Sequence, residues 1–99
     1  MHDALLEGRA FDAQRATTLS RGDSVEYVRA TLGEPLTITR HHDGSEDWRY
    51  FARRRIPRWI HILSVQFRLG SRVIRSEAIL RMRGGRLERF GKFEPETPE

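Results

Sequence analysis

Few residues in this sequence have the types and spacing that catalysis requires. Gly22-Asp23-Ser24 has the order of the serine block of some hydrolases. A serine nucleophile needs a base within hydrogen-bond reach and an acid that orients the base. No Asp-x-x-His pair follows to supply them. Ser24 instead precedes an apolar segment with helical spacing, where its hydroxyl would cap a helix. We therefore expect a helix cap at Ser24 and no catalytic residue in the chain.

Metal-binding residues are equally sparse. The sequence has no cysteine, and its four histidines are His2, His41, His42 and His61. The neighbours His41 and His42 would point to opposite sides of an extended backbone, so they cannot readily converge on one ion. The adjacent acids Glu46 and Asp47 are separated in the same way. We expect no metal site, no cofactor and no small-molecule substrate.

One cluster has a composition suited to binding. Arg53-Arg54-Arg55-Ile56-Pro57-Arg58 reads as a basic loop interrupted by proline, with aromatic residues beside it. Guanidinium groups form paired hydrogen bonds with carboxylates or phosphates and stack on aromatic rings. The alternative is a solvated strand face that binds nothing. The predicted partner-binding residues are Phe51, Arg54, Arg55, Arg58 and Trp59, with the arginines as electrostatic contacts and the aromatic residues as apolar anchors.

The charge of the chain is unevenly distributed. Lysine and arginine number 18 against 14 acids, which gives a net charge of +4, and Lys92 is the only lysine. Residues 1–34 have a net charge of −2, residues 35–93 of +9 and residues 94–99 of −3. Such asymmetry favours an acidic partner, which could be a protein face, anionic lipid headgroups or nucleic acid.

Length and composition predict one small domain. The 99 residues are 37% hydrophobic and 32% charged, enough for one core and too few for two. The longest early apolar run, Ala4 to Leu6, is too short for a signal peptide or a membrane span. We expect a flexible N-terminus over residues 1–10, a folded domain over 11–82 and a largely disordered tail over 83–99.

The first third of the chain predicts two helices. Apolar residues at loosely helical intervals favour a helix from about Phe11 to Leu19. A second helix is marked by Ser24 as N-cap and by a Gly33 stop reinforced by Pro35. Both helices precede the basic half of the chain.

Alternating patterns then predict strands. A short strand from Leu36 to Thr39 leads into a polar turn over 41–45, and a second strand contains Trp48, Tyr50 and Ala52 on one face. A third strand covers 60–69, Gly70-Ser71 supplies a reversal, and a fourth strand covers 73–82. The predicted fold class is α+β, with two N-terminal helices packed on a three- to four-stranded antiparallel meander sheet.

A set of glycine, capping and apolar positions forms a longer motif: Gly22, Ser24, Val28, Leu32, Gly33, Pro35, Gly44, Trp48, Tyr50, Val65, Phe67, Gly70 and Val73. Over about residues 15–76 this motif resembles the SmpA/OmlA family, the BamE-like domain of bacterial outer-membrane lipoproteins. The resemblance implies a two-helix, three-stranded fold without catalysis that acts as an accessory subunit of the outer-membrane β-barrel assembly machinery. The architecture is also similar to the repeat of β-lactamase inhibitory proteins, which work by binding.

These observations lead to three hypotheses about function. The first is a non-enzymatic protein-binding or scaffold module that braces an envelope complex at the periplasmic face of the outer membrane, if a leader has been removed. The second is a cytoplasmic arginine-rich nucleic-acid-binding protein, whose affinity would fall steeply with salt. This one is less favoured, because aromatic residues for base stacking are few. The third is an inhibitor-type domain that docks on an enzyme.

Overall fold

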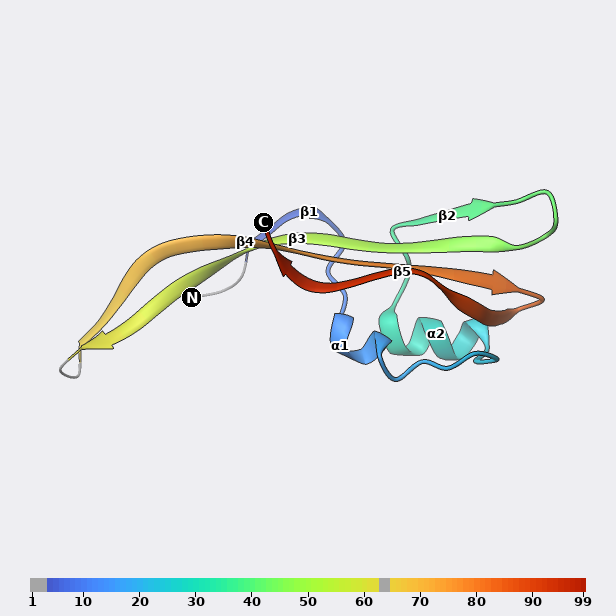
Figure 1. Cartoon of the computed structure of the whole chain (residues 1–99), viewed down its shortest axis with the longest axis horizontal. Helices are drawn as coiled ribbons and strands as arrows, with labels where there is room; N and C mark the ends of the chain where they lie inside the picture. Colours follow the sequence, from blue (N-terminus) through green and yellow to red (C-terminus); the bar gives the residue numbers. More distant parts are fainter. Residues whose placement is uncertain (1–3, 63–64) are drawn as a thin grey trace.

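The fold is that of a computed structural model. The structure describes residues 4–62 and 65–99; for residues 57–62, 65–69 and 71 it describes the backbone alone. The chain folds mainly as one antiparallel sheet (Figure 1). Its elements are β1 (Ala4–Gly8), α1 (Ala13–Ala16), α2 (Val25–Leu32), β2 (Thr37–Arg40), β3 (Glu46–Ile62), β4 (Val65–Arg83) and β5 (Arg86–Pro98).

The sheet is organised around two long central strands. Its order is β1-β3-β4-β5, and β2 pairs with β3 on the β1 side. β3 and β4 pair from Glu46↔Met82 to Ile62↔Val65. The longest extent of the molecule is 59 Å and the Cα radius of gyration is 16.7 Å, whereas about 13 Å is typical of a compact domain of this length. The structure is therefore elongated along the β3–β4 hairpin.

The predicted fold class, α+β with two helices on a meander sheet, is wrong. The described residues form mostly antiparallel sheet, with five strands, and the two helices are short, with four residues in α1 and eight in α2. The helix predicted from Phe11 to Leu19 is reduced to the single turn of α1, with Asp12 as its N-cap. The strand content is higher because two segments that read as loop and tail, 53–58 and 83–99, are largely strand.

The signals at the ends of α2 are confirmed. The Ser24 hydroxyl accepts a hydrogen bond from the Tyr27 amide at 3.1 Å, which satisfies one of the free donors of the first turn. Gly33 follows the last helical residue with φ of 83°, a conformation that glycine adopts without a Cβ penalty. Val28 and Leu32 are the buried residues of the helix.

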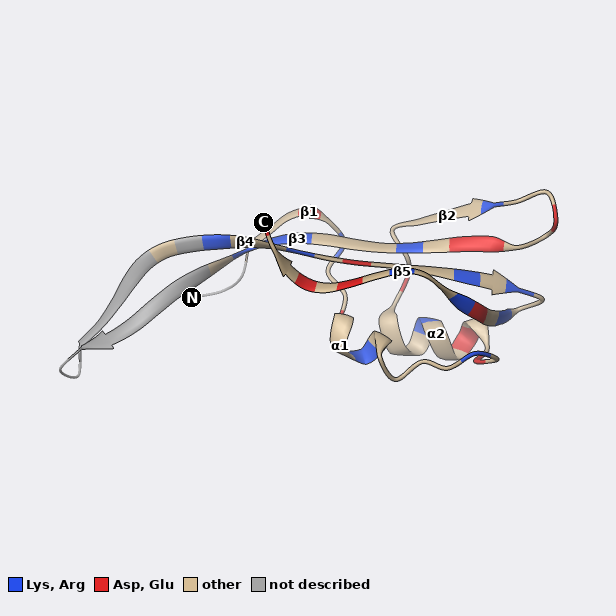
Figure 2. Ribbon diagram, in the orientation of Figure 1, with Lys and Arg blue, Asp and Glu red and all other residues tan. Residues whose placement is uncertain are grey.

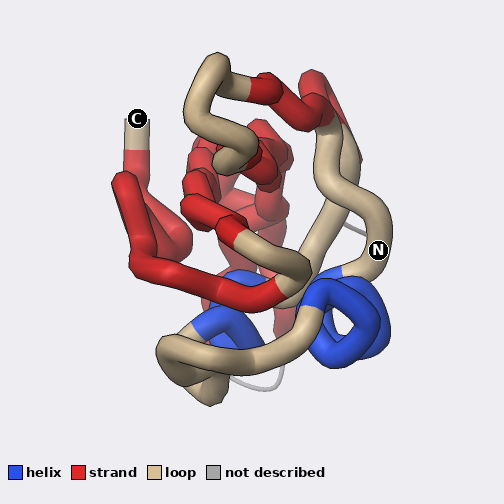
Figure 3. The backbone as a smooth tube through the Cα atoms, turned by 90° about the vertical axis from the view of Figure 1, so that its right-hand side faces the viewer, coloured by secondary structure: helices blue, strands red, loops and turns tan. Residues whose placement is uncertain are grey.

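The core lies between the helices and one face of the sheet, as the end-on view shows (Figure 3). Trp48 and Tyr50 are each 2% exposed, which confirms their predicted place in the core. The Tyr50 hydroxyl donates to the Gly33 carbonyl at 2.7 Å, and its burial raises the pKa of this phenol. The predicted third aromatic, Phe67, lies outside the described side chains. The cluster comprises Ala16, Leu19, Val28, Leu32, Trp48, Tyr50, Ala78, Leu80, Met82 and Leu87.

The predicted basic loop over 53–58 and the predicted reversal at Gly70-Ser71 are both wrong. Both segments lie inside long strands, and the last β3–β4 pair before the chain reverses is Ile62↔Val65. Pro57 pairs with Ser71, and the register shifts between Pro57 and Trp59. Proline and glycine in strands often mark a bulge rather than a strand end. Here they mark an irregularity within one continuous hairpin.

The end of the chain also differs from expectation. Residues 86–98 form β5 where the sequence predicted a largely disordered tail. Gly84 and Gly85, with φ of 60° and 75°, make the turn that returns the chain along β4. Leu87 is then buried at 2% exposure, and Phe90 and Phe93 pack against the core. These apolar contacts stabilise β5 although the segment is rich in charged residues and contains proline.

Strand β1 forms within the segment predicted to be a flexible N-terminus. It pairs with β3 from Ala4↔Arg55 to Gly8↔Ala52. The amide of Arg9 then donates to the Phe51 carbonyl at 2.9 Å. A Cβ at Gly8 would collide with this carbonyl, so the close approach of the two strands depends on glycine.

Substituting Gly8→Ala is expected to detach β1 from β3. The alanine would have a φ of 82° as well as the collision with Phe51, so we expect a loss of about 2 kcal/mol in the free energy of unfolding. Urea denaturation measures this loss, and faster amide exchange over Ala4–Gly8 reports the detachment.

Gly22→Ala is the matched control. Gly22 also has positive φ, at 96°, but no atom lies within 4 Å of a Cβ built there. We expect it to cost about 1 kcal/mol, from backbone strain alone. Equal losses from the two variants, with exchange over Ala4–Gly8 unchanged, would contradict the role of Gly8.

Candidate partner-binding site

The five predicted binding residues all lie on β3. Phe51 is buried, Arg54 is half-buried and Arg55 is exposed. Arg58 and Trp59 lie further along β3, where the structure describes the backbone alone and pairs Trp59 with Arg68 of β4. The strand brings the five residues into one line, and its alternation places Phe51 and Arg55 on one face of the sheet and Arg54 on the other.

Phe51 lies on the face of the sheet away from the helices and is still only 7% exposed. Two guanidinium groups cover its ring: the Cζ atoms of Arg49 and Arg75 lie 4.6 and 5.6 Å from the ring centroid. Such cation–π contacts are worth about 0.5–1 kcal/mol at exposed positions. In this structure, Phe51 therefore has intramolecular partners on its ring.

A buried carboxylate anchors these cations. The side chain of Glu77 is 5% exposed and forms ion pairs with Arg49 at 2.8 Å, Lys92 at 3.0 Å and Arg75 at 3.3 Å. Burial by itself would raise the pKa of Glu77, but hydrogen bonds from Arg49 and Lys92 and the nearby positive charges outweigh it, so the pKa is lowered. Glu77 thus holds three strands together as a carboxylate.

Arginines near the point where β1 and β5 stop are also paired within the chain. Arg53 contacts Glu99 at 2.8 Å and Glu7 at 3.2 Å, and Arg54 contacts Glu96 at 2.9 Å. The hydrogen bond from Arg53 lowers the pKa of Glu99. Beside Arg54 is a surface hollow of about 440 Å³, lined by Ala10, Phe11, Asp12, Ala13, Arg54 and Glu96.

The β3–β4 hairpin extends past the described pairs of its flanking strands. We call residues 55–73 the arm; it begins at the pair Arg55↔Val73. Among the described residues, β1 pairs with β3 as far as Arg55, and β5 pairs with β4 as far as Ile74. In the described part of the arm, the pairs run between β3 and β4 alone from Ile56↔Arg72 onward.

The arm carries the whole net charge of the protein. Its sequence holds four arginines and no acid, whereas the other 80 residues hold 14 basic and 14 acidic residues. Figure 2 shows acidic segments on β5, at the start of β3, in the turn before it and on α2, with basic segments on the same parts of the structure. Not one Asp or Glu occurs between Asp47 and Glu77. Carboxylates on β1 and β5 therefore pair with arginines as far as the base of the arm, and the arm itself contains no Asp or Glu.

Two further arginines belong to this charged arm. Arg68 and Arg72 are not among the predicted binding residues. The hairpin pairs Trp59 with Arg68 and Ile56 with Arg72, which places both beside the predicted set. The sequence signal was the acid-free stretch itself. The misassigned reversal at Gly70 hid which residues face one another across the strands.

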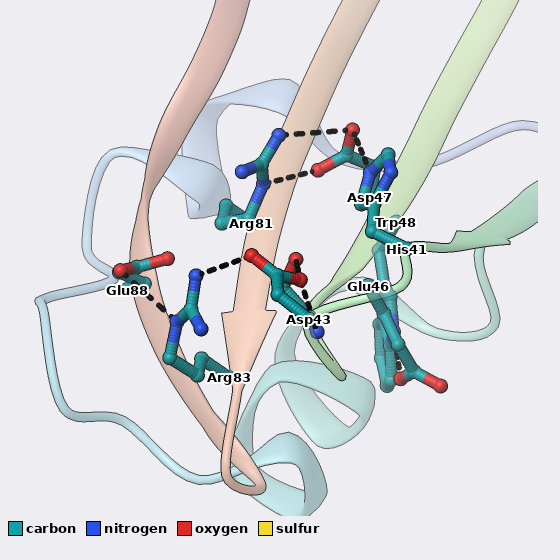
Figure 4. A network of polar contacts seen from close by, with 9 residues as sticks. His41, Asp43, Glu46, Asp47, Trp48, Arg81, Arg83 and Glu88 are labelled. Atoms are coloured by element: carbon teal, nitrogen blue, oxygen red, sulfur yellow. Dashed lines mark hydrogen bonds and ion pairs between the residues drawn. The ribbon is translucent and has the colours of Figure 1, made fainter.

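A second polar cluster lies at the other end of the hairpin (Figure 4). Arg81 contacts Asp47 at 2.7 Å, and Asp47 also contacts His41 at 2.9 Å. Arg83 contacts Asp43 at 2.9 Å and Glu88 at 3.3 Å. Hydrogen bonds from Ser45 and Arg83 lower the pKa of Asp43, and the hydrogen bond from Arg81 lowers that of Asp47. These contacts tie the β2–β3 turn to β4 and β5.

Neither cluster offers a metal or catalytic constellation. Over residues 4–62 and 65–99, no three His, Asp or Glu side chains with described positions are placed to hold a metal ion together. The Ser24 hydroxyl is used as a helix cap, and the Asp23 carboxylate accepts the Ser20 amide at 2.7 Å. The residues that looked most like a hydrolase motif therefore serve a turn and a helix start.

Comparison with known proteins adds no assignment: no family model, curated protein or solved structure matches this chain. The SmpA/OmlA resemblance therefore stays a prediction that rests on the motif residues alone. No helix within the described residues has the length and apolar content needed to cross a membrane.

The substitution Glu77→Gln is expected to destabilise the sheet most strongly at neutral pH. It removes a charge that three cations share, and hydrogen bonds to charged groups are worth about 2 kcal/mol. Because the folded state lowers the pKa of Glu77 below its ordinary value of 4.5, this stabilisation is complete above that value and is lost as the pH falls below it.

Urea denaturation at pH 7 and pH 3 tests whether the charge of the Glu77 carboxylate stabilises the fold. We expect wild type and Glu77→Gln to differ by about 2 kcal/mol at pH 7 and by much less at pH 3. Glu26→Gln, which removes an exposed carboxylate from the first turn of α2, is the control for loss of charge. A difference for Glu77→Gln that is the same at both pH values would exclude the carboxylate as its source.

Proposed function

We propose that this protein is a non-enzymatic binding module whose arm engages an acidic surface on a protein partner. The observation that carries the proposal is the acid-free stretch between Asp47 and Glu77, within which the arm holds four arginines and no acid. These arginines are Arg55, Arg58, Arg68 and Arg72. In the described remainder of the sheet, carboxylates from other strands pair with arginines such as Arg49, Arg53 and Arg54.

The composition of the arm supports the proposal that another molecule binds to it. Nine of its 19 residues are hydrophobic, a higher proportion than the 37% of the whole chain. Two-stranded hairpins are at best marginally stable alone in water, and a third strand or a packed face normally supports them. An apolar, basic hairpin that extends past its sheet is therefore best explained if another molecule covers it.

The residue types in the arm favour a protein as the partner. Arginine and tryptophan are enriched among the residues that dominate protein–protein binding, and isoleucine, valine and phenylalanine fill apolar contacts. The arm contains all of these, with Trp59 between Arg58 and Ile60. An enzyme cleft with acidic walls is one such surface, so the inhibitor-type hypothesis is a special case. The outer-membrane setting stays a prediction from the resemblance.

One observation favours nucleic acid as the second candidate. A two-stranded antiparallel ribbon has the width to enter the major groove of DNA, and arginine binds both phosphate and guanine. The arm is such a ribbon with a net charge of +4. Its high apolar content is the reason for ranking this candidate below a protein partner.

Neutralising the arm tests the proposal. The arm variant is Arg55→Gln/Arg58→Gln/Arg68→Gln/Arg72→Gln, and it leaves the Arg54–Glu96 ion pair intact. The partner captured by the wild-type chain from the native host is purified and titrated calorimetrically. We expect a protein partner whose affinity for the arm variant is at least tenfold lower, because four charge contacts are lost.

A control variant removes four positive charges from positions outside the arm. Arg9→Gln/Arg15→Gln/Arg21→Gln/Arg89→Gln changes four exposed arginines outside the arm and is expected to bind the partner normally. Equal affinity of the arm variant and wild type would exclude the arm as the binding site. Binding of a purified DNA or RNA duplex that weakens steeply with salt, without a protein partner, would establish the nucleic-acid alternative.

A further inference from the structure

Tyr27, on α2, differs from the other aromatic residues whose side chains the structure describes. It is 50% exposed, and its ring has neither an aromatic nor a cationic neighbour among the described residues. An aromatic ring contributes most to binding when another group covers it. The rings that already have such a neighbour are those of Phe11, Trp48, Tyr50, Phe51, Phe90 and Phe93.

The ring of Tyr27 borders a surface hollow of about 380 Å³ between the two helices. Ligand-binding pockets commonly have volumes of about 300–1,000 Å³, so the hollow is at the small end of this range. Tyr27, Ala30 and Thr31 lie on one side of α2, because residues three and four apart in a helix are neighbours. Arg15 and Thr18, in and just after α1, complete the lining.

The hollow is positively charged, because Arg15 is the one charged residue in its lining. The side chain of Arg15 is 65% exposed, and its Nε lies 3.9 Å from the Asp12 carboxylate. That carboxylate already accepts the amides of Gln14 and Arg15 as the cap of α1. A guanidinium has five N–H donors, so most of those of Arg15 are available to a ligand.

We propose that this hollow binds a carboxylate attached to an apolar group. The apolar group lies against Tyr27 and Ala30, and the carboxylate accepts paired hydrogen bonds from the Arg15 guanidinium. No acid lines the hollow to repel the ligand. The inference is independent of the proposed function, because no lining residue belongs to the arm.

Two matched ligands test the charge requirement with the full chain. Phenylpropionate and phenylpropanamide share a ring and a chain length, but only the first carries a negative charge. We expect phenylpropionate to shift the amide NMR signals of Thr18, Tyr27 and Ala30 saturably, and the amide to bind at least fivefold more weakly. Equal affinities would exclude the contact between Arg15 and a carboxylate and overturn the inference.

Three chain variants locate the site. Ala30→Leu fills the hollow with another good helix former, and it is expected to weaken phenylpropionate binding at least fivefold. Arg15→Gln is expected to do the same by removing the charge. Arg21→Gln, at an exposed position outside the lining, is expected to leave the affinity unchanged. The same loss in all three variants would overturn the site.

The arm variant Arg55→Gln/Arg58→Gln/Arg68→Gln/Arg72→Gln separates this inference from the proposed function. We expect it to bind phenylpropionate as wild type does, since the arm contributes nothing to the hollow. Shifts confined to residues 55–73, abolished in the arm variant and unchanged by Ala30→Leu, would overturn the hollow and leave the proposed function standing.

A free aromatic acid and the C-terminal residue of a peptide share this chemistry, and a third ligand distinguishes them. The probe is an acetylated Gly-Gly-Phe tripeptide with a free C-terminal carboxylate. Tighter binding of the tripeptide than of phenylpropionate would support a peptide terminus as the ligand, and weaker binding would support a free acid. Failure of both to shift the signals of the lining residues would overturn the inference.

Discussion

The antiparallel pairing of β3 with β4 is the constraint on which the rest of the structure depends. Its register sets Trp48 opposite Leu80 and Tyr50 opposite Ala78, so the apolar residues of both strands face the helices. The same register places Arg49 and Phe51 on the other face, beside Glu77. A slip by one residue would exchange the two faces and bury the arginines.

Charge is arranged along this hairpin in two regimes. Near the helices and flanking strands, arginines are matched by carboxylates from β1, β4 and β5, which lie within ion-pair distance. The exposed pairs among these contribute little each, and the combined effect of all the pairs is a surface close to neutral. In the arm, positive charge accumulates instead, which destabilises an isolated hairpin and favours an acidic neighbour.

Much of the local structure was predictable because it depends on residues close in sequence. Ser24, Gly33 and Gly44 mark a helix start, a helix end and a turn, and each takes the expected conformation. Alternation of Trp48 and Tyr50 with Arg49 correctly divided the two faces of β3. The predicted binding residues Arg54 and Arg55 lie on the strand that forms one side of the arm.

The tertiary structure decided what local signals could not. Pro57 and Gly70 read as breaks, but sixteen residue pairs between β3 and β4 keep both inside one hairpin. The charged end of the chain reads as disordered, but Leu87 is buried and Glu96 and Glu99 find arginines far away in sequence. Sequence alone determined the capped helix, the strand faces and the acid-free stretch, because these depend on residue type and spacing. Tertiary contacts decided the length of the hairpin, because its strand pairs run as far as Glu46↔Met82. They also decided the neutral base of the arm, because its ion pairs join residues more than 40 positions apart.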